Sequence, residues 1–252
     1  MKAVPILACA AAVAAIAGCN NQQNNGASNA PLKLEPVKPP AGGDWTEIAT
    51  ATPAGGFLMG NPQAKVQLVE YGSMTCPHCR AFDETGVSSL INTYVKSGQV
   101  SYEFRNYVRD AFDLTASLIA RCNGASGFFP LERALYKDQL VWIGKIQAVP
   151  QEQIQQLQSL GPNRQFLEIA KLAGFQDWAA MRGIPQAKST QCLTNTNEVD
   201  RLVKMTGDAT DQFPDFPGTP TFILNGKMVD LGPTTEKEVW PKLEAKLREA
   251  LG

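Results

Sequence analysis

Residues 76–79 read Cys76-Pro77-His78-Cys79, and this run decides how the chain folds. The six residues before it, Val66 to Tyr71, are mostly β-branched, apolar or aromatic, which predicts a strand. After it, apolar residues recur at helical spacing to about Lys96. Cys76 is then expected at the helix N-cap and Pro77 at the first helical position, where its missing N–H costs nothing. A thiol at that place faces backbone N–H groups and the positive end of the helix dipole, both of which favour the thiolate.

Two cysteines at this spacing form either a redox disulfide or half of a metal site. The flanking strand and helix favour the redox interpretation, because the thiolate is the species that attacks disulfides. Further along, Val100, Tyr102 and Phe104 alternate with polar residues, which predicts a half-buried strand over 100–105. Strand, helix and strand at this spacing predict a βαβ unit with parallel strands.

The rest of the chain shows two further patterns. Residues 112–207 carry apolar stripes at helical spacing and little alternation, so a run of helices is expected there. Asn225-Gly226 between two apolar runs predicts a β-hairpin, and the apolar positions from Val239 to Leu251 predict a final helix. A short strand is also expected at Trp45–Ala49, where ordered structure is predicted to start.

Composition excludes some classes of function. The chain has 252 residues and a net charge of −1 without a long basic run, which argues against nucleic acid as a partner. Its length suits one large domain or one domain with an insertion.

The N-terminus predicts export. Lys2 and the apolar run of residues 3–17 are typical of a secretory signal. Ile16-Ala17-Gly18-Cys19 resembles a bacterial lipobox, which implies a lipid on Cys19; the alternative is an ordinary cleaved signal. Asn20 is not the aspartate associated with retention in the inner membrane, so the resemblance favours the outer membrane. Residues 20–44 are rich in Asn, Gln, Ala, Pro and Gly, which predicts a disordered tether.

These observations predict three segments: a lipoprotein-type signal peptide (1–18), a tether (19–44) and a folded domain (45–252). The domain consists of a core (about 45–110 and 208–252) and a helical insertion (about 112–207). Of the six cysteines, Cys9 leaves with the signal and Cys19 is expected to be lipidated. Four remain, and an even number in an exported chain suggests disulfides.

The predicted element order, with a CxxC motif after the first strand, resembles the thioredoxin fold. The helical stretch between the two halves resembles the DsbA-like branch of that superfamily, and Cys76-Pro77-His78-Cys79 is similar to its active-site sequence. The runs Gly60-Asn61-Pro62, Val69-Glu70-Tyr71-Gly72 and Gly218-Thr219-Pro220-Thr221-Phe222 also resemble its members. The resemblance covers about residues 45–252. It implies an α/β, thioredoxin-like fold with a large helical insertion, and thiol–disulfide oxidoreductase activity that needs no metal or organic cofactor.

The resemblance also implies roles for single residues. Cys76 would be the nucleophile and Cys79 the resolving thiol. Pro220 would be a cis-proline that faces the disulfide, and the Thr219 backbone would pair with an extended substrate. His78, between the cysteines, would stabilise the Cys76 thiolate; the alternative is an exposed loop residue.

Glu70 matches the position of a buried acid that is proposed to exchange protons with the resolving cysteine. A buried carboxyl has a raised pKa and suits that role. The alternative is a glutamate at a strand edge in water.

Exported relatives with a helical insertion carry a structural disulfide there, which implies a Cys122–Cys192 bridge. Closing a loop of about 70 residues stabilises by roughly 4 kcal/mol at most in the chain-entropy model. Two buried free thiols and a second redox pair remain as alternatives.

The function predicted from the resemblance is disulfide formation or exchange in envelope proteins. Isomerase and reductase directions use the same residues and stay open. The expected partners are unfolded or cysteine-containing exported proteins and a membrane redox protein that recycles the pair. The short, polar tether lacks a dimerisation domain, so a monomer is expected, in the periplasm and anchored to a membrane by lipid. The alternatives from another class are a non-catalytic scaffold and a lipoprotein that binds zinc through Cys76, Cys79, Cys122 and Cys192.

Overall fold

The strand predicted ahead of the CPHC motif, β3 (Val66–Gly72), lies inside a six-stranded mixed sheet. The structure is a computed structural model, and it describes Met1 and residues 34–252. The strand order is β1-β2-β4-β3-β5-β6. The other strands are β1 (Ala49–Ala51), β2 (Phe57–Gly60), β4 (Val100–Asn106), β5 (Thr221–Leu224) and β6 (Lys227–Met228). As predicted, β3 and β4 run parallel, with Val66 opposite Val100 and Gly72 opposite Asn106; the other neighbouring strands are antiparallel.

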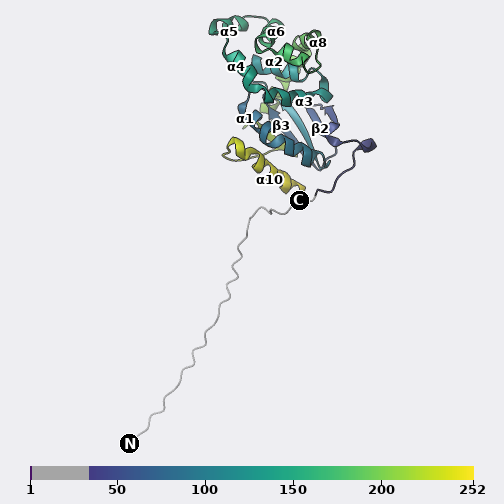
Figure 1. Cartoon of the computed structure of the whole chain (residues 1–252). Coiled ribbons are helices and arrows are strands. Elements are labelled where there is room, and N and C mark those ends of the chain that lie inside the picture. The colour runs from purple at the N-terminus through teal and green to yellow at the C-terminus, as the bar shows by residue number, and fades with distance from the viewer. Residues whose placement is uncertain (2–33) are drawn as a thin grey trace. The chain divides into compact units, whose positions relative to one another are not determined.

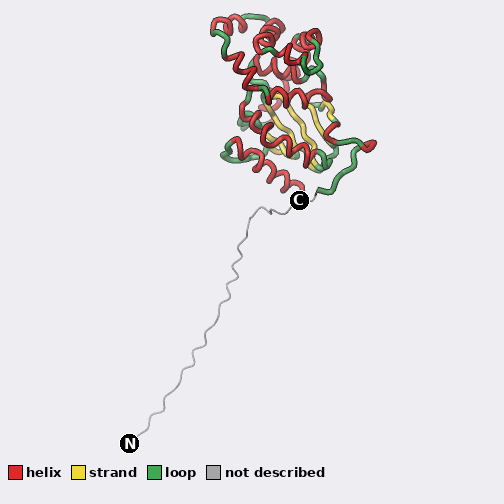
Figure 2. The backbone as a smooth tube through the Cα atoms, in the orientation of Figure 1, coloured by secondary structure: helices red, strands yellow, loops and turns green. Residues whose placement is uncertain are grey.

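The helix after the motif runs without a break from Pro77 to Val95, close to its predicted end. It begins as α1 (Pro77–Phe82) and continues through the π-helical turns η3 (Asp83–Val87) and η4 (Leu90–Val95). The predicted helical insertion is α2 (Ala111–Ala120), α3 (Gly124–Lys137), α4 (Gln139–Gln147), α5 (Gln151–Gln158), α6 (Pro162–Ala173), α7 (Phe175–Ala180), α8 (Gln186–Leu193) and α9 (Thr196–Gln212). The last helices are η5 (Glu236–Glu238) and α10 (Val239–Leu251). Figures 1 and 2 show α4, α5, α6 and α8 gathered at the end of the domain opposite α10, with the strands between them.

The predicted hairpin forms between β5 and β6. Asn225 and Gly226 have φ values of 49° and 79°, and two successive positive φ angles suit the tight turn that joins twisted antiparallel strands. Asn225 also ties this turn to β3, because its side-chain oxygen accepts the Gln67 N–H at 2.8 Å.

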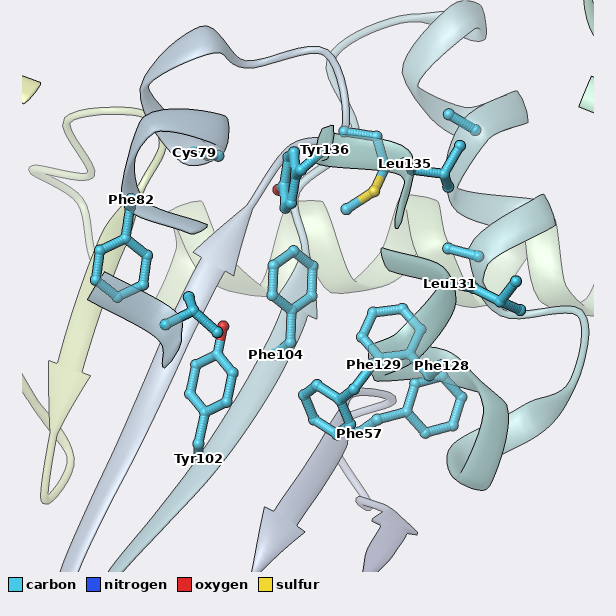
Figure 3. Close-up of a cluster of buried hydrophobic side chains, with 14 of the residues drawn as sticks. Phe57, Cys79, Phe82, Tyr102, Phe104, Phe128, Phe129, Leu131, Leu135 and Tyr136 are labelled. Carbon is cyan, nitrogen blue, oxygen red and sulfur yellow. The ribbon is translucent and has the colours of Figure 1, made fainter. Parts of the chain in front are cut away.

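Aromatic side chains fill the core between the sheet and the helices after the motif. The Phe128 ring on α3 lies 4.8 Å from the Phe57 ring and 5.4 Å from the Phe104 ring, centroid to centroid. Figure 3 shows Tyr102 and Phe104 of β4 facing the side chains of α1 and α3, including Cys79 and Tyr136. The CPHC motif therefore lies on the packed core and not on a separate loop.

The prediction that β4 is half-buried is wrong. Its polar residues Ser101 and Glu103 are only 1% and 7% exposed, so both faces of the strand are covered. On the second face β4 contacts α9, whose Ala209 belongs to a smaller buried cluster with Tyr71. Because α9 follows β4 by about 90 residues, no local pattern in the strand could show that it is covered there. Strand β2 was also missed, since it lies in a stretch rich in Gly and Pro.

The start of the domain differs from the prediction as well. The segment Trp45–Ala49, expected to be a strand, begins with a 3-10 turn, η2 (Trp45–Glu47), because the Asp44 carboxylate caps it by accepting the Thr46 N–H at 2.9 Å. Upstream of it, the Trp45 indole N–H donates to the Val37 carbonyl at 2.8 Å. The Gln99 amide also donates to the Glu35 carbonyl at 2.7 Å, and the Val37 N–H donates to the Ser97 carbonyl at 2.8 Å, so this part of the predicted tether is docked on the domain.

The predicted signal peptide, the lipidation site Cys19 and the first part of the tether lie outside the described residues. Among the residues that are described, no helix combines the length and the apolar character needed to cross a membrane.

Candidate active site

Cys76 occupies the N-cap of α1 and Pro77 its first position, as the sequence predicts. Cys76 has an extended backbone, with φ −80° and ψ 122°, and its carbonyl accepts the Arg80 N–H at 3.2 Å, which starts the helix. The proline fits because the first helical N–H has no partner inside a helix. The nucleophile candidate thus lies where the end of β3 turns into a helix.

The Cys76 sulfur is nearly enclosed and strongly polarised. Cys76 is 2% exposed, and its sulfur lies 3.2 Å from the Thr219 carbonyl oxygen. The largest influence on the Cys76 pKa is a hydrogen bond from Cys79, which lowers it. The Thr219 side chain and the backbone N–H groups of Cys79 and His78 lower it further. Together these bonds outweigh the effect of burial and bring the pKa to about 5. Cys76 is therefore a thiolate at neutral pH.

Cys79 is the opposite case. It lies one turn into α1, is completely buried, and is a free thiol like Cys76. Burial, the hydrogen bond to Cys76 and the negative charges of Cys76 and Glu70 raise its pKa well above the ordinary value. Cys79 therefore holds its proton far more tightly than Cys76 does.

Glu70 lies on β3 beneath the two cysteines. It is 1% exposed, which excludes the alternative of a strand-edge glutamate in water. Burial raises its pKa to about 8, although the Tyr102 hydroxyl donates to it at 2.6 Å and acts in the other direction. At neutral pH this carboxyl is protonated and holds a proton close to Cys79.

His78 points away from the core. Its imidazole is 61% exposed, and Nδ1 lies 3.1 Å from Glu236 Oε1 in η5. The group of His78 that bonds to the Cys76 sulfur is its backbone N–H. The predicted electrostatic role of the imidazole stays a prediction, and its partner Glu236 was not anticipated from the sequence.

Thr219 and Pro220 approach the cysteines from the strand next to β3. The pairing of Tyr71 with Thr221 places the start of β5 beside the end of β3, just before the CPHC turn. The Thr219–Pro220 peptide bond is cis, as the resemblance implies. The bond of the Thr219 side chain to the Cys76 sulfur, in addition to the contact of its backbone, was not predicted from the sequence.

The other two cysteines are joined to each other. Cys122 and Cys192 form a disulfide with Cα atoms 5.5 Å apart, between the end of α2 and α8. This bond uses two of the four thiolates that the zinc alternative needs. Within residues 34–252, no group of three or more Cys, His, Asp or Glu side chains is arranged to hold a metal ion.

Comparison with known proteins gives a consistent result. A family model described as Thioredoxin matches residues 52–240. Proteins of Rickettsia prowazekii and Rickettsia bellii, named by inference as protein-disulfide oxidoreductases, are 26% and 27% identical to the chain over 171 residues. These matches cover 68% of this chain and 54% and 57% of the two relatives, so the chain spans about half the length of each.

Two solved structures are similar to this chain over 75% and 77% of its length. The crystal structure of a protein-disulfide isomerase from Novosphingobium aromaticivorans is similar with a TM-score of 0.70 and 34% identity, over 75% of this chain and 96% of that one. The α-DsbA1 protein of Wolbachia pipientis is similar with a TM-score of 0.58 and 20% identity, over 77% and 91% of the two chains. The second likeness shows the fold alone, over most of both chains.

Proposed function

This chain belongs to the thioredoxin family, and we propose that it is an exported thiol–disulfide oxidoreductase of the DsbA type. The observation that carries the proposal is the contrast between its two free thiols. The pKa of Cys76 is lowered to about 5, whereas that of Cys79 is raised well above the ordinary value. A thiolate next to a protonated resolving thiol is the arrangement that disulfide exchange requires.

The reaction follows from the two sulfurs. In the oxidised protein, a substrate thiolate attacks the Cys76 sulfur of the Cys76–Cys79 disulfide, which forms a mixed disulfide and releases Cys79 as a thiolate. Cys79 takes up a proton. A second substrate thiolate then attacks the substrate sulfur of the mixed disulfide and releases the Cys76 thiolate. The substrate loses two electrons and the protein gains them, so a redox partner must reoxidise the pair.

Glu70 is the proposed source of the proton for Cys79. Its pKa of about 8 makes it neutral at pH 7, and when it loses its proton its negative charge raises the pKa of Cys79. A buried acid with a pKa near the working pH is suited to proton exchange. In the reverse direction, Glu70 would accept the proton when Cys79 resolves a mixed disulfide.

Oxidation is the direction that the site favours. Everything that stabilises the Cys76 thiolate stabilises the reduced protein, and a more stable reduced form makes the disulfide a stronger oxidant. Disulfide isomerisation is the second candidate, because the structure with 34% identity is named a protein-disulfide isomerase.

The substrate is a polypeptide in either case: an extended chain would pair with the Thr219 backbone beside Pro220. Leu140 and Val141, next to the Gln139 side chain that bonds to the Cys76 carbonyl, are 67% and 64% exposed and offer apolar contacts.

Export and anchoring complete the proposal. The apolar run of residues 3–17 followed by Gly18-Cys19 supports a signal peptide with a lipid on Cys19. A lipid anchor would place the domain in the periplasm at a membrane surface. Replacing Cys19 by Ala would then release the protein from the membrane fraction of its host, and an unchanged membrane fraction would argue against the anchor.

A trapping experiment tests the catalytic roles. In a Cys79→Ser variant the mixed disulfide cannot be resolved, so a reduced, unfolded secreted protein should accumulate as an adduct on Cys76. The Cys76→Ser/Cys79→Ser double variant is the matched control and should trap nothing. No adduct on a Cys76 that still reacts with an alkylating agent would contradict the proposal.

The reduction potential then separates the directions. Equilibration of the domain with glutathione buffers should give a value near the oxidising end, about −120 mV as in DsbA. A value near that of thioredoxin, about −270 mV, would indicate a reductant instead.

A further inference from the structure

The four residues before Pro77, Ser73 to Cys76, form a turn that is held by side chains of the helical insertion. Asp113 on α2 holds its first half: its carboxylate accepts the Ser73 hydroxyl at 2.6 Å and the Met74 N–H at 2.8 Å. The Arg109 guanidinium donates to the Thr75 hydroxyl at 2.7 Å. These contacts span about 40 residues of sequence, so they depend on how the insertion docks.

Two side chains from α3 and α4 hold the backbone carbonyls of the same turn. The Tyr136 hydroxyl donates to the Ser73 carbonyl at 3.1 Å. The Gln139 amide nitrogen donates to the Met74 carbonyl at 2.8 Å and to the Cys76 carbonyl at 3.0 Å. Ser73, Met74 and Cys76 therefore each bond to at least one side chain of the insertion, and Thr75 bonds to Arg109 just before it.

The bond to the Cys76 carbonyl is not needed to satisfy that group. The same oxygen already accepts the Arg80 N–H at the start of α1. A second donor from Gln139, itself 1% exposed, restricts the orientation of the peptide plane beside the reactive sulfur. Asp113, with no exposed surface, restricts the backbone two residues earlier.

We propose that Gln139 and Asp113 are positioning residues that fix the direction of the Cys76 sulfur. That sulfur meets the Thr219 carbonyl oxygen at 3.2 Å and the backbone N–H groups of His78 and Cys79, and these contacts require one orientation of the turn. The inference rests on the proposed function, since it treats Cys76 as the reactive group. The inference assigns the helical insertion a role in disulfide exchange, because Gln139 and Asp113 of the insertion orient the turn that carries the Cys76 sulfur.

The test is a Gln139→Met variant, which removes both donors and keeps the length of the side chain. Thiolate absorbance of the reduced protein is followed against pH. The Cys76 thiol should bind its proton about tenfold more tightly in the variant, a shift of about one pH unit. The control is Gln176→Met, the same change at another glutamine of the insertion, whose amide bonds to the Thr190 hydroxyl at 2.9 Å. This control should leave the Cys76 titration unchanged.

The outcomes separate the inference from the proposed function. If Gln139→Met lowers the melting temperature but leaves the Cys76 titration unchanged, Gln139 is only structural and the inference is wrong. If this variant does not fold, Tyr136→Phe, which loses one hydroxyl, should shift the titration in the same direction, and no shift would refute the inference. An unmodified protein whose Cys76 titrates like an ordinary thiol, at about pH 8.5, would instead refute the proposed function.

Discussion

Replacing Glu70 by Gln should make the domain more stable at alkaline pH and leave its stability at acid pH nearly unchanged. Gln has the shape of a protonated Glu, and its carbonyl oxygen can still accept the Tyr102 hydroxyl that donates to Glu70 at 2.6 Å. The substitution therefore removes the ability to ionise and keeps the packing. If the change in the free energy of unfolding caused by Glu70→Gln varies with pH, that variation reports the protonation of Glu70.

The size of the effect follows from the two pKa values of this carboxyl. Burial raises the Glu70 pKa from 4.5 to about 8 in the folded protein. Between these values the unfolded chain has released the proton while the folded protein still holds it, so stability falls as the pH rises and the loss is complete above about pH 8. At about 1.4 kcal/mol for each unit of pKa difference, the loss is at most about 5 kcal/mol.

The assay is urea unfolding of the reduced protein at a series of pH values. The free energy of unfolding of the Glu70→Gln variant should match that of the unmodified protein near about pH 4 and exceed it by several kcal/mol near about pH 9. Glu47→Gln, at an exposed position, is the control and should follow the unmodified protein at every pH. A difference between the Glu70→Gln variant and the unmodified protein that stays constant with pH would refute a neutral Glu70.

Three further predictions concern the cysteines. Alkylation of Cys76 should have its pH midpoint at about 5, where its thiol deprotonates; a midpoint at about 8.5 would indicate an ordinary thiol. Thr219→Val removes a side-chain hydrogen bond to the same sulfur and should raise that midpoint by about 0.5–1 pH unit, and an unmoved midpoint would show that this bond is unimportant. Cys122→Ser/Cys192→Ser should lower the free energy of unfolding by roughly 4 kcal/mol at most without slowing exchange at Cys76, and slower exchange in a folded double variant would contradict a purely structural disulfide.

Local patterns were enough to predict the elements that carry the two thiols. The strand before the motif, the N-cap position of Cys76 and the hairpin at Asn225 depend on residues close in sequence, and the structure has all three. The cis bond before Pro220 and the Cys122–Cys192 pairing needed the family resemblance, because nothing in the neighbouring residues specifies either of them.

The remaining features of the site depend on residues far apart in sequence. Gln139 is the first residue of α4, and its contact with the Cys76 carbonyl joins positions 63 residues apart. Tyr102 was assigned to the apolar face of β4, and only the pairing with β3 shows that its hydroxyl meets Glu70. Hydrophobic periodicity cannot predict hydrogen bonds of this kind, because it identifies which residues are buried and not which polar groups meet in the core.

The strand order also determines how much unpaired strand backbone the sheet exposes at its two edges. The sheet ends in β1, with three residues, on one side and in β6, with two exposed residues, on the other. Unpaired edge strands recruit extended chains, and short or charged edges prevent this. At β6 only Lys227 and Met228 could pair with another strand, and the lysine is charged. If the protein acts on unfolded chains as proposed, it would offer them a reactive cysteine but little free strand backbone on which they could pair.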